Sequence, residues 1–143
     1  MRARPTGLTK DAGWQIGVSR TLPHPPSAVW EFVSGPEGLA LWLGPGAELT
    51  PERGAPYRTA DGVEGEVRGY RPGDRIRVTY GPTTVQVAVS PAGDGTRAVL
   101  RLHQERMASR EERERQRAHW RDVAARIAAA LDGRADPGAS ARP

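Results

Sequence analysis

Residues 109–133 read SREERERQRAHWRDVAARIAAALDG, and their pattern predicts one long amphipathic helix. Ser109 can cap the first turn, and Glu112 lies three residues later, at the acidic position of a capping box. Apolar residues then recur at steps of three and four, which places them on one helix face: Trp120, Val123, Ala124, Ile127, Ala128 and Leu131. Gly133 supplies the stop signal, with Pro137 beyond it.

The apolar face of this helix needs a partner surface, and the preceding sequence predicts an antiparallel sheet. Turn signals recur at hairpin spacing, at Asp61-Gly62, Pro72-Gly73-Asp74, Gly81-Pro82 and Gly93-Asp94-Gly95. Near the start, Trp14, Ile16 and Val18 alternate with polar or small residues, as in a strand with one buried face. The predicted strands are 14–22, 46–50, 54–60, 63–71, 74–80, 83–90 and 96–107.

Two short helices are predicted after the first strand. Pro26 suits the first position of a helix that runs to Val33, and residues 37–43 form the second. Because no helix separates the later strands, neighbouring strands are expected to run antiparallel. The order predicts an α+β fold in which a curved, seven-stranded antiparallel sheet grips the last helix over a cavity.

Length and composition limit the class of protein. The 143 residues suit one domain, and we expect a flexible leader at 1–13, the domain at 14–133 and a disordered tail at 134–143. The sequence has no run of 18 apolar residues and no secretory signal, so a cytoplasmic location without a membrane span is expected. The absence of cysteine excludes disulfides, thiolate catalysis and cysteine metal sites.

The formal charge of +4 does not by itself indicate nucleic-acid binding. Residues 14–104 hold nine arginines and nine acidic residues, so the excess comes from the leader and from the start of the last helix. Between residues 106 and 121 arginines mix with Glu111, Glu112 and Glu114. Alternating charge is typical of a solvated helix face, and we do not expect a nucleic-acid partner.

Several blocks of sequence resemble one family. The resemblance covers roughly residues 14–131, and the blocks are Pro26–Trp30 (PSAVW), Pro36–Leu39 (PEGL) with Trp42, Gly69–Ile76 (GYRPGDRI), Gly95-Thr96, and His103–Arg106 (HQER) followed by residues 110–117 and His119-Trp120. Together with the element order they resemble the AHSA-type branch, named for an activator of a heat-shock chaperone ATPase, of the START-like, Bet v-type (SRPBCC) helix-grip superfamily. The last block is similar to the end of bacterial members.

The resemblance implies a helix-grip fold with a hydrophobic cavity under the C-terminal helix. The superfamily includes lipid carriers, polyketide cyclases and chaperone activators. This sequence departs from the family pattern before the strand that contains Tyr57, where Gly54 stands in place of the usual glycine pair. The eukaryotic chaperone activators carry an additional domain that is not found in this sequence, so a chaperone partner is not expected.

The candidate ligand-binding residues combine an apolar wall with a few polar groups. The resemblance places cavity walls at Trp42 and Trp120, and aromatic walls with few polar groups are typical of small-molecule pockets. Tyrosines on neighbouring strands, or an inward arginine, can orient a ligand carboxylate or phenolate. The predicted ligand-binding residues are Trp42, Tyr57, Tyr80, His103, Trp120, Val123 and Ile127.

His103 is the polar candidate whose orientation the sequence leaves open. The alternation of Ala98, Leu100 and Leu102 turns His103 to the opposite face of the sheet unless a bulge intervenes. His103, Glu105 and His119 are suitable metal ligands, but no local motif joins them. We therefore predict neither a metal nor another cofactor.

The leading hypothesis is a small-molecule binding protein, with an apolar, aromatic or amphipathic ligand under residues 109–132. A binding module is preferred to an enzyme, because no serine elbow, phosphate loop or spaced acid pair is present. One alternative is a cyclase, dehydratase or isomerase that uses His103, Tyr57 or Tyr80 as acid or base. The other is a co-chaperone-like or homodimeric interaction module that uses the outer sheet or the charged start of the last helix.

Overall fold

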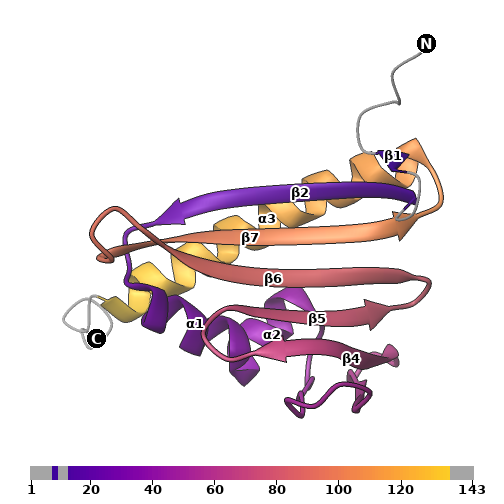
Figure 1. The fold of residues 1–143 in the computed structure, drawn as a ribbon, viewed down its shortest axis with the longest axis horizontal. Helices are drawn as coiled ribbons and strands as arrows, with labels where there is room; N and C mark the ends of the chain where they lie inside the picture. Colours follow the sequence, from indigo (N-terminus) through magenta and orange to yellow (C-terminus); the bar gives the residue numbers. More distant parts are fainter. Residues whose placement is uncertain (1–7, 10–12, 136–143) are drawn as a thin grey trace, which may run out of the picture.

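This computed structural model describes residues 8–9 and 13–135, which form an antiparallel sheet and three helices (Figure 1). The chain order is β1 (Leu8–Thr9), β2 (Gly13–Leu22), α1 (Pro26–Ser34), α2 (Pro36–Trp42), β3 (Pro56–Arg58), β4 (Glu64–Arg71), β5 (Arg75–Tyr80), β6 (Thr83–Ala92), β7 (Arg97–Met107) and α3 (Arg110–Ala135). The α+β class, the antiparallel sheet and the long C-terminal helix are confirmed.

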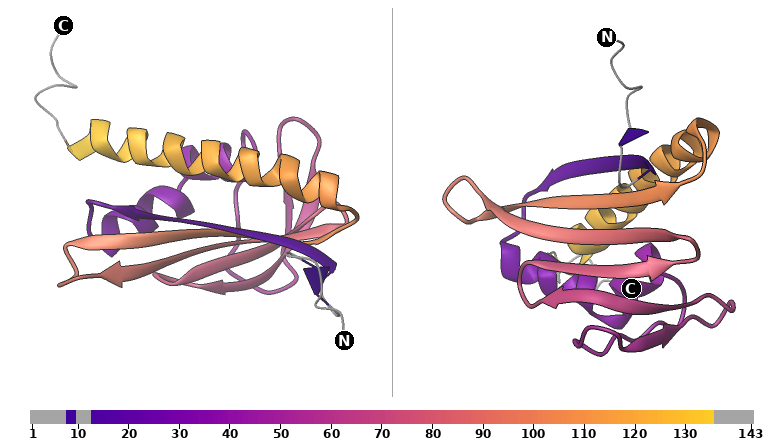
Figure 2. Two further views of the ribbon diagram at one scale, coloured as in Figure 1. Left: turned by 90° about the horizontal axis from the view of Figure 1, so that it is seen from above. Right: turned by 45° about the vertical axis from the view of Figure 1, so that its right-hand side comes forward.

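The sheet follows the order β1-β2-β7-β6-β5-β4-β3, and each neighbouring pair is antiparallel. Strands β4 to β7 are successive hairpins, and β2 pairs along the far side of β7. All three helices lie on one side of this sheet, as the left view of Figure 2 shows. We call that side the inner face and the opposite side the outer face.

Helix α3 forms for the reasons that its sequence indicates. The Ser109 hydroxyl accepts a hydrogen bond from the Glu112 backbone N–H at 3.1 Å, so the predicted N-terminal cap is present. Glu112 Oε2 is buried and has no hydrogen-bond partner in the described structure. The six stripe residues from Trp120 to Leu131 are all buried. The helix continues past Gly133, which lacks the positive φ of a helix-terminating glycine, to Ala135.

The expected strand at 46–50 is absent, and the predicted set of seven strands is wrong in that respect. Gly44 and Gly46 have positive φ angles of 152° and 74°, and the Ala60 backbone N–H donates to Pro45 O, so this segment turns instead of extending. Strand β1 lies within the expected leader and was not predicted. Most of the expected leader and tail, residues 1–7, 10–12 and 136–143, lies outside the described residues.

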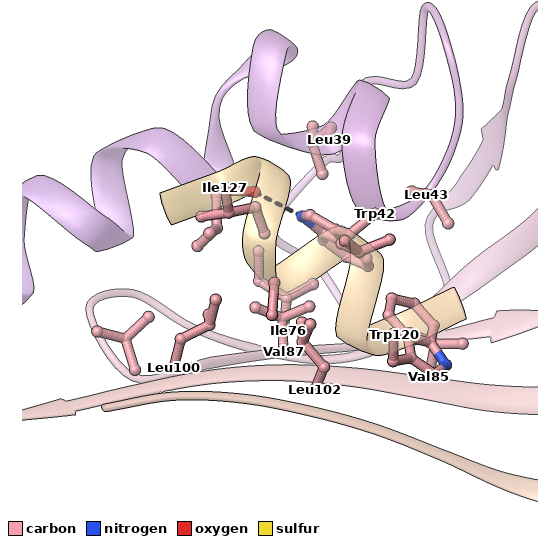
Figure 3. Packing of buried hydrophobic residues seen from close by; sticks show 14 of the residues in the cluster. Leu39, Trp42, Leu43, Ile76, Val85, Val87, Leu100, Leu102, Trp120 and Ile127 are labelled. Carbon is pink, nitrogen blue, oxygen red and sulfur yellow. Dashed lines mark hydrogen bonds between the residues drawn. The ribbon is translucent and has the colours of Figure 1, made fainter. Parts of the chain in front are cut away.

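The space between sheet and helices is filled by apolar side chains (Figure 3). Ile76, Val87, Leu100 and Leu102 of the sheet and Ile127 of α3 are each at most 1% exposed. Burying side chains of this size stabilises the fold by about 1.5–3 kcal/mol each. Close packing over the C-terminal half of α3 confines any opening to its N-terminal half.

Two β-bulges interrupt the alternation of the sheet. Between the pairs Trp14–Met107 and Ile16–Gln104, strand β7 has one more residue than β2, and Arg106 adopts a φ of 67° there. Between the pairs formed by Val67 and Gly69, strand β4 has an extra residue, Arg68, relative to β5. Each bulge resets which residues face the helices.

Candidate functional site

A pocket of about 160 Å³ opens beneath the N-terminal half of α3. The apolar part of its lining comes from Trp42 of α2, Val85 of β6 and Trp120 of α3. Both indoles are almost fully buried, at 3% and 2% exposure, so they act as rigid walls. The remaining lining residues are Tyr80, Gln104, Gln116 and His119. The candidate site is therefore a half-polar, aromatic pocket at one end of the helix–sheet interface.

The side chain of Gln104 organises the polar wall of this pocket. Its Oε1 accepts hydrogen bonds from Trp120 Nε1 at 2.9 Å and from Gln116 Nε2 at 2.8 Å. Its Nε2 donates to the Thr83 hydroxyl at 2.9 Å. On the other wall, Trp42 Nε1 donates to the Val33 carbonyl at 2.8 Å, the bond drawn in Figure 3. Both indole N–H groups are thus satisfied, which fixes the ring planes.

Two polar groups of the lining remain available to a ligand. Within the described part of the chain, neither the Tyr80 hydroxyl nor the His119 imidazole has a hydrogen-bond partner. The His119 ring lies at the rim, edge-on to Trp120 at a centroid distance of 4.8 Å. Partial burial lowers the pKa of His119, an effect that the nearby Asp122 opposes, so the imidazole is neutral at pH 7.

The structure brings together three of the seven predicted ligand-binding residues: Trp42, Tyr80 and Trp120. Val123 and Ile127 are packed in the core, at 2% and 0% exposure, and do not line the pocket. Tyr57 lies on β3, where its hydroxyl donates to the Thr79 carbonyl. Burial, with a smaller contribution from the charge of Tyr80, raises the pKa of Tyr57 to about 12.

His103 lies on the outer face of the sheet and is absent from the pocket. It is paired with Gly17 and Gln86 between the buried residues Leu102 and Gln104, and its Nε2 is 2.9 Å from Gln15 Oε1. Burial is the main cause that lowers its pKa. The bulge in β7 follows Gln104, too late in the strand to turn His103 inward.

This placement of His103 separates it from His119, one of the other two residues that were considered as metal ligands, while Glu105 lies near His103. His119 lies on α3, on the other side of the sheet. Glu105 is buried and paired with Arg77. Among residues 8–9 and 13–135, no group of three or more His, Asp or Glu side chains is arranged to hold a metal ion.

Sequence reasoning missed Val85, Gln104, Gln116 and His119 as lining residues. Gln104 had a usable signal, because it continues the inward alternation of Ala98, Leu100 and Leu102 and is a polar residue on an apolar face. Gln116 lies four residues before Trp120 and therefore on the same helix face. A buried glutamine next to a helical glutamine and tryptophan indicates a polar network at the pocket wall.

The helix-grip class of α+β proteins is defined by an antiparallel sheet, two short helices and a long C-terminal helix that packs on the sheet. The profile of the family described as Activator of Hsp90 ATPase homolog 1-like protein matches residues 23–132, and the chain belongs to that family. Among proteins with curated functions, none matches the sequence. In the described residues no helix is long and apolar enough to cross a membrane.

Solved structures share this fold at low sequence identity. Protein MLL2253 from Mesorhizobium loti is 20% identical, with a TM-score of 0.69 over 82% of this chain and 96% of its own. CalU16 from Micromonospora echinospora is 18% identical, with a TM-score of 0.68 over 86% and 80% of the two chains. DynU16, a protein in the dynemicin biosynthetic locus, is 27% identical, with a TM-score of 0.67 over 82% and 47%.

Proposed function

We propose that the chain binds a small, neutral aromatic molecule in the pocket beneath α3. The observation that carries this proposal is the juxtaposition of two buried indoles, Trp42 and Trp120, with two polar groups, on Tyr80 and His119, that have no hydrogen-bond partner among the described residues. Binding would remove an aromatic ring from water against the indole walls, while one polar substituent of the ligand pairs with Tyr80 or His119.

The volume of the pocket limits the size of the ligand. Drug-sized ligands occupy pockets of about 300–1,000 Å³, whereas an apolar cavity of about 150 Å³ holds a single benzene ring. At about 160 Å³ the pocket suits one ring with a small substituent. A lipid chain or a polycyclic ligand would require α3 to move away from Val85 and Gln104.

The polar wall favours a ligand without charge. Gln104 Oε1 already accepts two hydrogen bonds, and the lowered pKa of His119 leaves a neutral ring with one donor and one acceptor. No charged group lines the pocket to offset the desolvation of an ionised ligand. A phenol, which both donates and accepts a hydrogen bond, matches this wall better than a benzoate.

The family and one structural neighbour support a small-molecule ligand. DynU16 lies in the dynemicin biosynthetic locus. Acid–base chemistry by His103 on a ligand in this pocket is not proposed, because His103 lies on the opposite face of the sheet.

A cytoplasmic location and a homodimer remain predictions from the sequence.

Binding of phenol, followed by tryptophan fluorescence and by chemical shifts of the indole N–H groups, tests the proposal. Phenol should shift the Trp120 and Trp42 signals, while benzoate at the same concentration should not. Tyr80→Phe removes the free hydroxyl and should weaken phenol binding about threefold to tenfold. Tyr70→Phe is the matched control, since Tyr70 packs against Trp30 outside the pocket. Equal binding of phenol to both variants, or no shift in wild type, would refute the site.

A further inference from the structure

We propose that the outer face of the sheet carries a second site, which binds a phosphate monoester or inorganic phosphate. The site is a hollow of about 350 Å³ whose lining includes Arg53, Arg68, Arg77 and Arg106 together with Thr84. We call it the arginine hollow. It goes beyond the proposed function, because it lies across the sheet from the pocket beneath α3.

The position on the outer face follows from the register of the strands. Arg77 lies between Ile76 and Val78, both fully buried on the inner face. Thr84 pairs with Thr79 on one side and with Glu105 on the other, two residue pairs along from Arg77 and therefore on the same face. These side chains alternate with the core residues, so none of them shares a surface with Trp120.

Both β-bulges of the sheet bring an arginine to this hollow. In β7 the strict alternation from Ala98 to Gln104 would point residue 106 into the core, and the bulge turns Arg106 outward at a φ of 67°. In β4 the extra residue is Arg68 itself. Bulges often re-aim a side chain beside a functional site, and a positive φ at a residue other than glycine costs free energy.

A loop that is tied to β4 supplies the fourth arginine. The Gly54 backbone N–H donates to the Val67 carbonyl at 2.7 Å, and the Val67 N–H donates to the Ala55 carbonyl at 2.8 Å. These two bonds hold the segment that contains Arg53 beside Arg68. The hollow therefore collects guanidinium groups from one loop and from β4, β5 and β7.

The positive charge of the hollow is only partly compensated. Arg68 pairs with Glu66 at 2.8 Å, and Arg77 pairs with the buried Glu105. In residues 8–9 and 13–135, no carboxylate forms an ion pair with Arg53 or Arg106. The four guanidinium groups and two carboxylates leave a net charge of +2, which an entering dianion would balance.

The Thr84 hydroxyl adds a specific hydrogen-bonding group to this charge. Thr84 is 7% exposed and lines the hollow, and its hydroxyl has no hydrogen-bond partner within the described structure. An oxyanion held by the arginines can accept this hydrogen bond.

Phosphate is the anion that best matches these groups. Guanidinium forks bind phosphate oxygens in a bidentate manner, and a phosphate monoester carries nearly two negative charges at pH 7. The volume is about ten times the roughly 30 Å³ share of one water molecule in the liquid, so the organic part of an ester also fits.

Calorimetric titration of the full chain with inorganic phosphate and with glycerol 3-phosphate, in a phosphate-free buffer of low ionic strength, tests the proposal. Glycerol 3-phosphate has no ring, so it does not compete for the aromatic pocket. Wild type should bind both anions, and added salt should weaken binding. Arg53→Ala and Arg106→Gly should each weaken it about tenfold, since each removes charge-assisted hydrogen bonds.

Two further variants distinguish a specific phosphate site from a general effect of positive charge on phosphate affinity. Arg75→Ala is the matched control, because Arg75 is an exposed arginine on the same strand and face as Arg77 but does not line the hollow. It should change affinity less than about twofold. Thr84→Val keeps the shape and the net charge and should weaken binding about threefold or more.

Two results would overturn the arginine hollow as a phosphate site. One is the absence of heat from either anion at millimolar concentration; the other is an equal loss of affinity in Arg75→Ala and Arg53→Ala. Arg53 lies in an exposed loop, so its variant keeps the test valid even if Arg106→Gly unfolds. Tyr80→Phe should leave phosphate affinity unchanged, so failure of the aromatic pocket and failure of the hollow are distinguishable.

Discussion

The two faces of the sheet differ although the same strands build both. On β5, Ile76 and Val78 are fully buried beneath the helices, while Arg75 and Arg77 face outward. The pocket beneath α3 has a volume of about 160 Å³, whereas the arginine hollow on the outer face has a volume of about 350 Å³. Closing one face with helices leaves a small, neutral, aromatic site, and leaving the other open preserves a broad, charged one.

The largest effect is expected where the inner face is most tightly closed. Trp120→Ala removes a side chain that is 2% exposed together with its hydrogen bond to Gln104, and should lower the free energy of unfolding by about 3–5 kcal/mol. It should also abolish phenol binding. Urea denaturation measures the first effect. Arg75→Ala on the outer face should cost less than about 0.5 kcal/mol. Similar urea midpoints for Trp120→Ala and Arg75→Ala would contradict the proposed difference in packing between the inner and outer faces.

The next effect concerns the contact between the two short helices α1 and α2 on the inner face. A Cβ atom at Gly38 of α2 would lie 2.0 Å from the Phe32 carbonyl oxygen of α1, so the backbone would have to move. Gly38→Ala should therefore destabilise the protein by about 1–3 kcal/mol, although alanine is the better helix former. Gly69→Ala is the control, because its Cβ would make an ordinary 4.0 Å contact with Arg77. A gain of thermal stability in Gly38→Ala would show that the helices are loosely packed.

The third prediction tests the burial of Tyr57 through the pH dependence of the free energy of unfolding. Burial raises the pKa of Tyr57 to about 12, above the value of about 10 in an unfolded chain. The folded state thus favours the neutral phenol, and the resulting stabilisation is complete below about pH 10 and is lost as pH rises toward 12. The loss should be on the order of 2 kcal/mol. Unfolding free energies at several alkaline pH values should fall more steeply for wild type than for Tyr57→Phe; parallel curves would exclude this role of Tyr57.

The smallest effect is expected on the outer face. Arg106→Gly relieves the cost of a positive φ, about 1–2 kcal/mol, but adds backbone entropy to the unfolded chain, about 0.5–1 kcal/mol. The net result should be a gain of about 0–1.5 kcal/mol in the free energy of unfolding, measured by thermal unfolding. Arg106→Ala removes the same charge without relieving the strain and should not be stabilised. If both variants behave alike, the strain at Arg106 is not what limits stability.

How far the sequence predicted the candidate site depended on the distance between the residues involved. Trp42, Tyr80 and Trp120 were predicted from local periodicity or from the family resemblance, and they line the pocket beneath α3. Val123 and Ile127 share the face of Trp120 but lie over the packed part of the sheet. No local pattern reports how much empty volume remains between two elements that lie far apart in the chain.

The sequence by itself determined the elements of this protein. The stripe from Trp120 to Leu131, the cap at Ser109 and the glycine turns are local patterns, and each acts through neighbouring backbone and side chains. Only the tertiary structure decided which face His103 and Arg106 occupy, how Gln104 joins Trp120 to Thr83, and that four arginines meet in one hollow. The physical reason is that a bulge of one residue inverts the alternation beyond it, and that cavities and charge clusters arise from packing between distant segments.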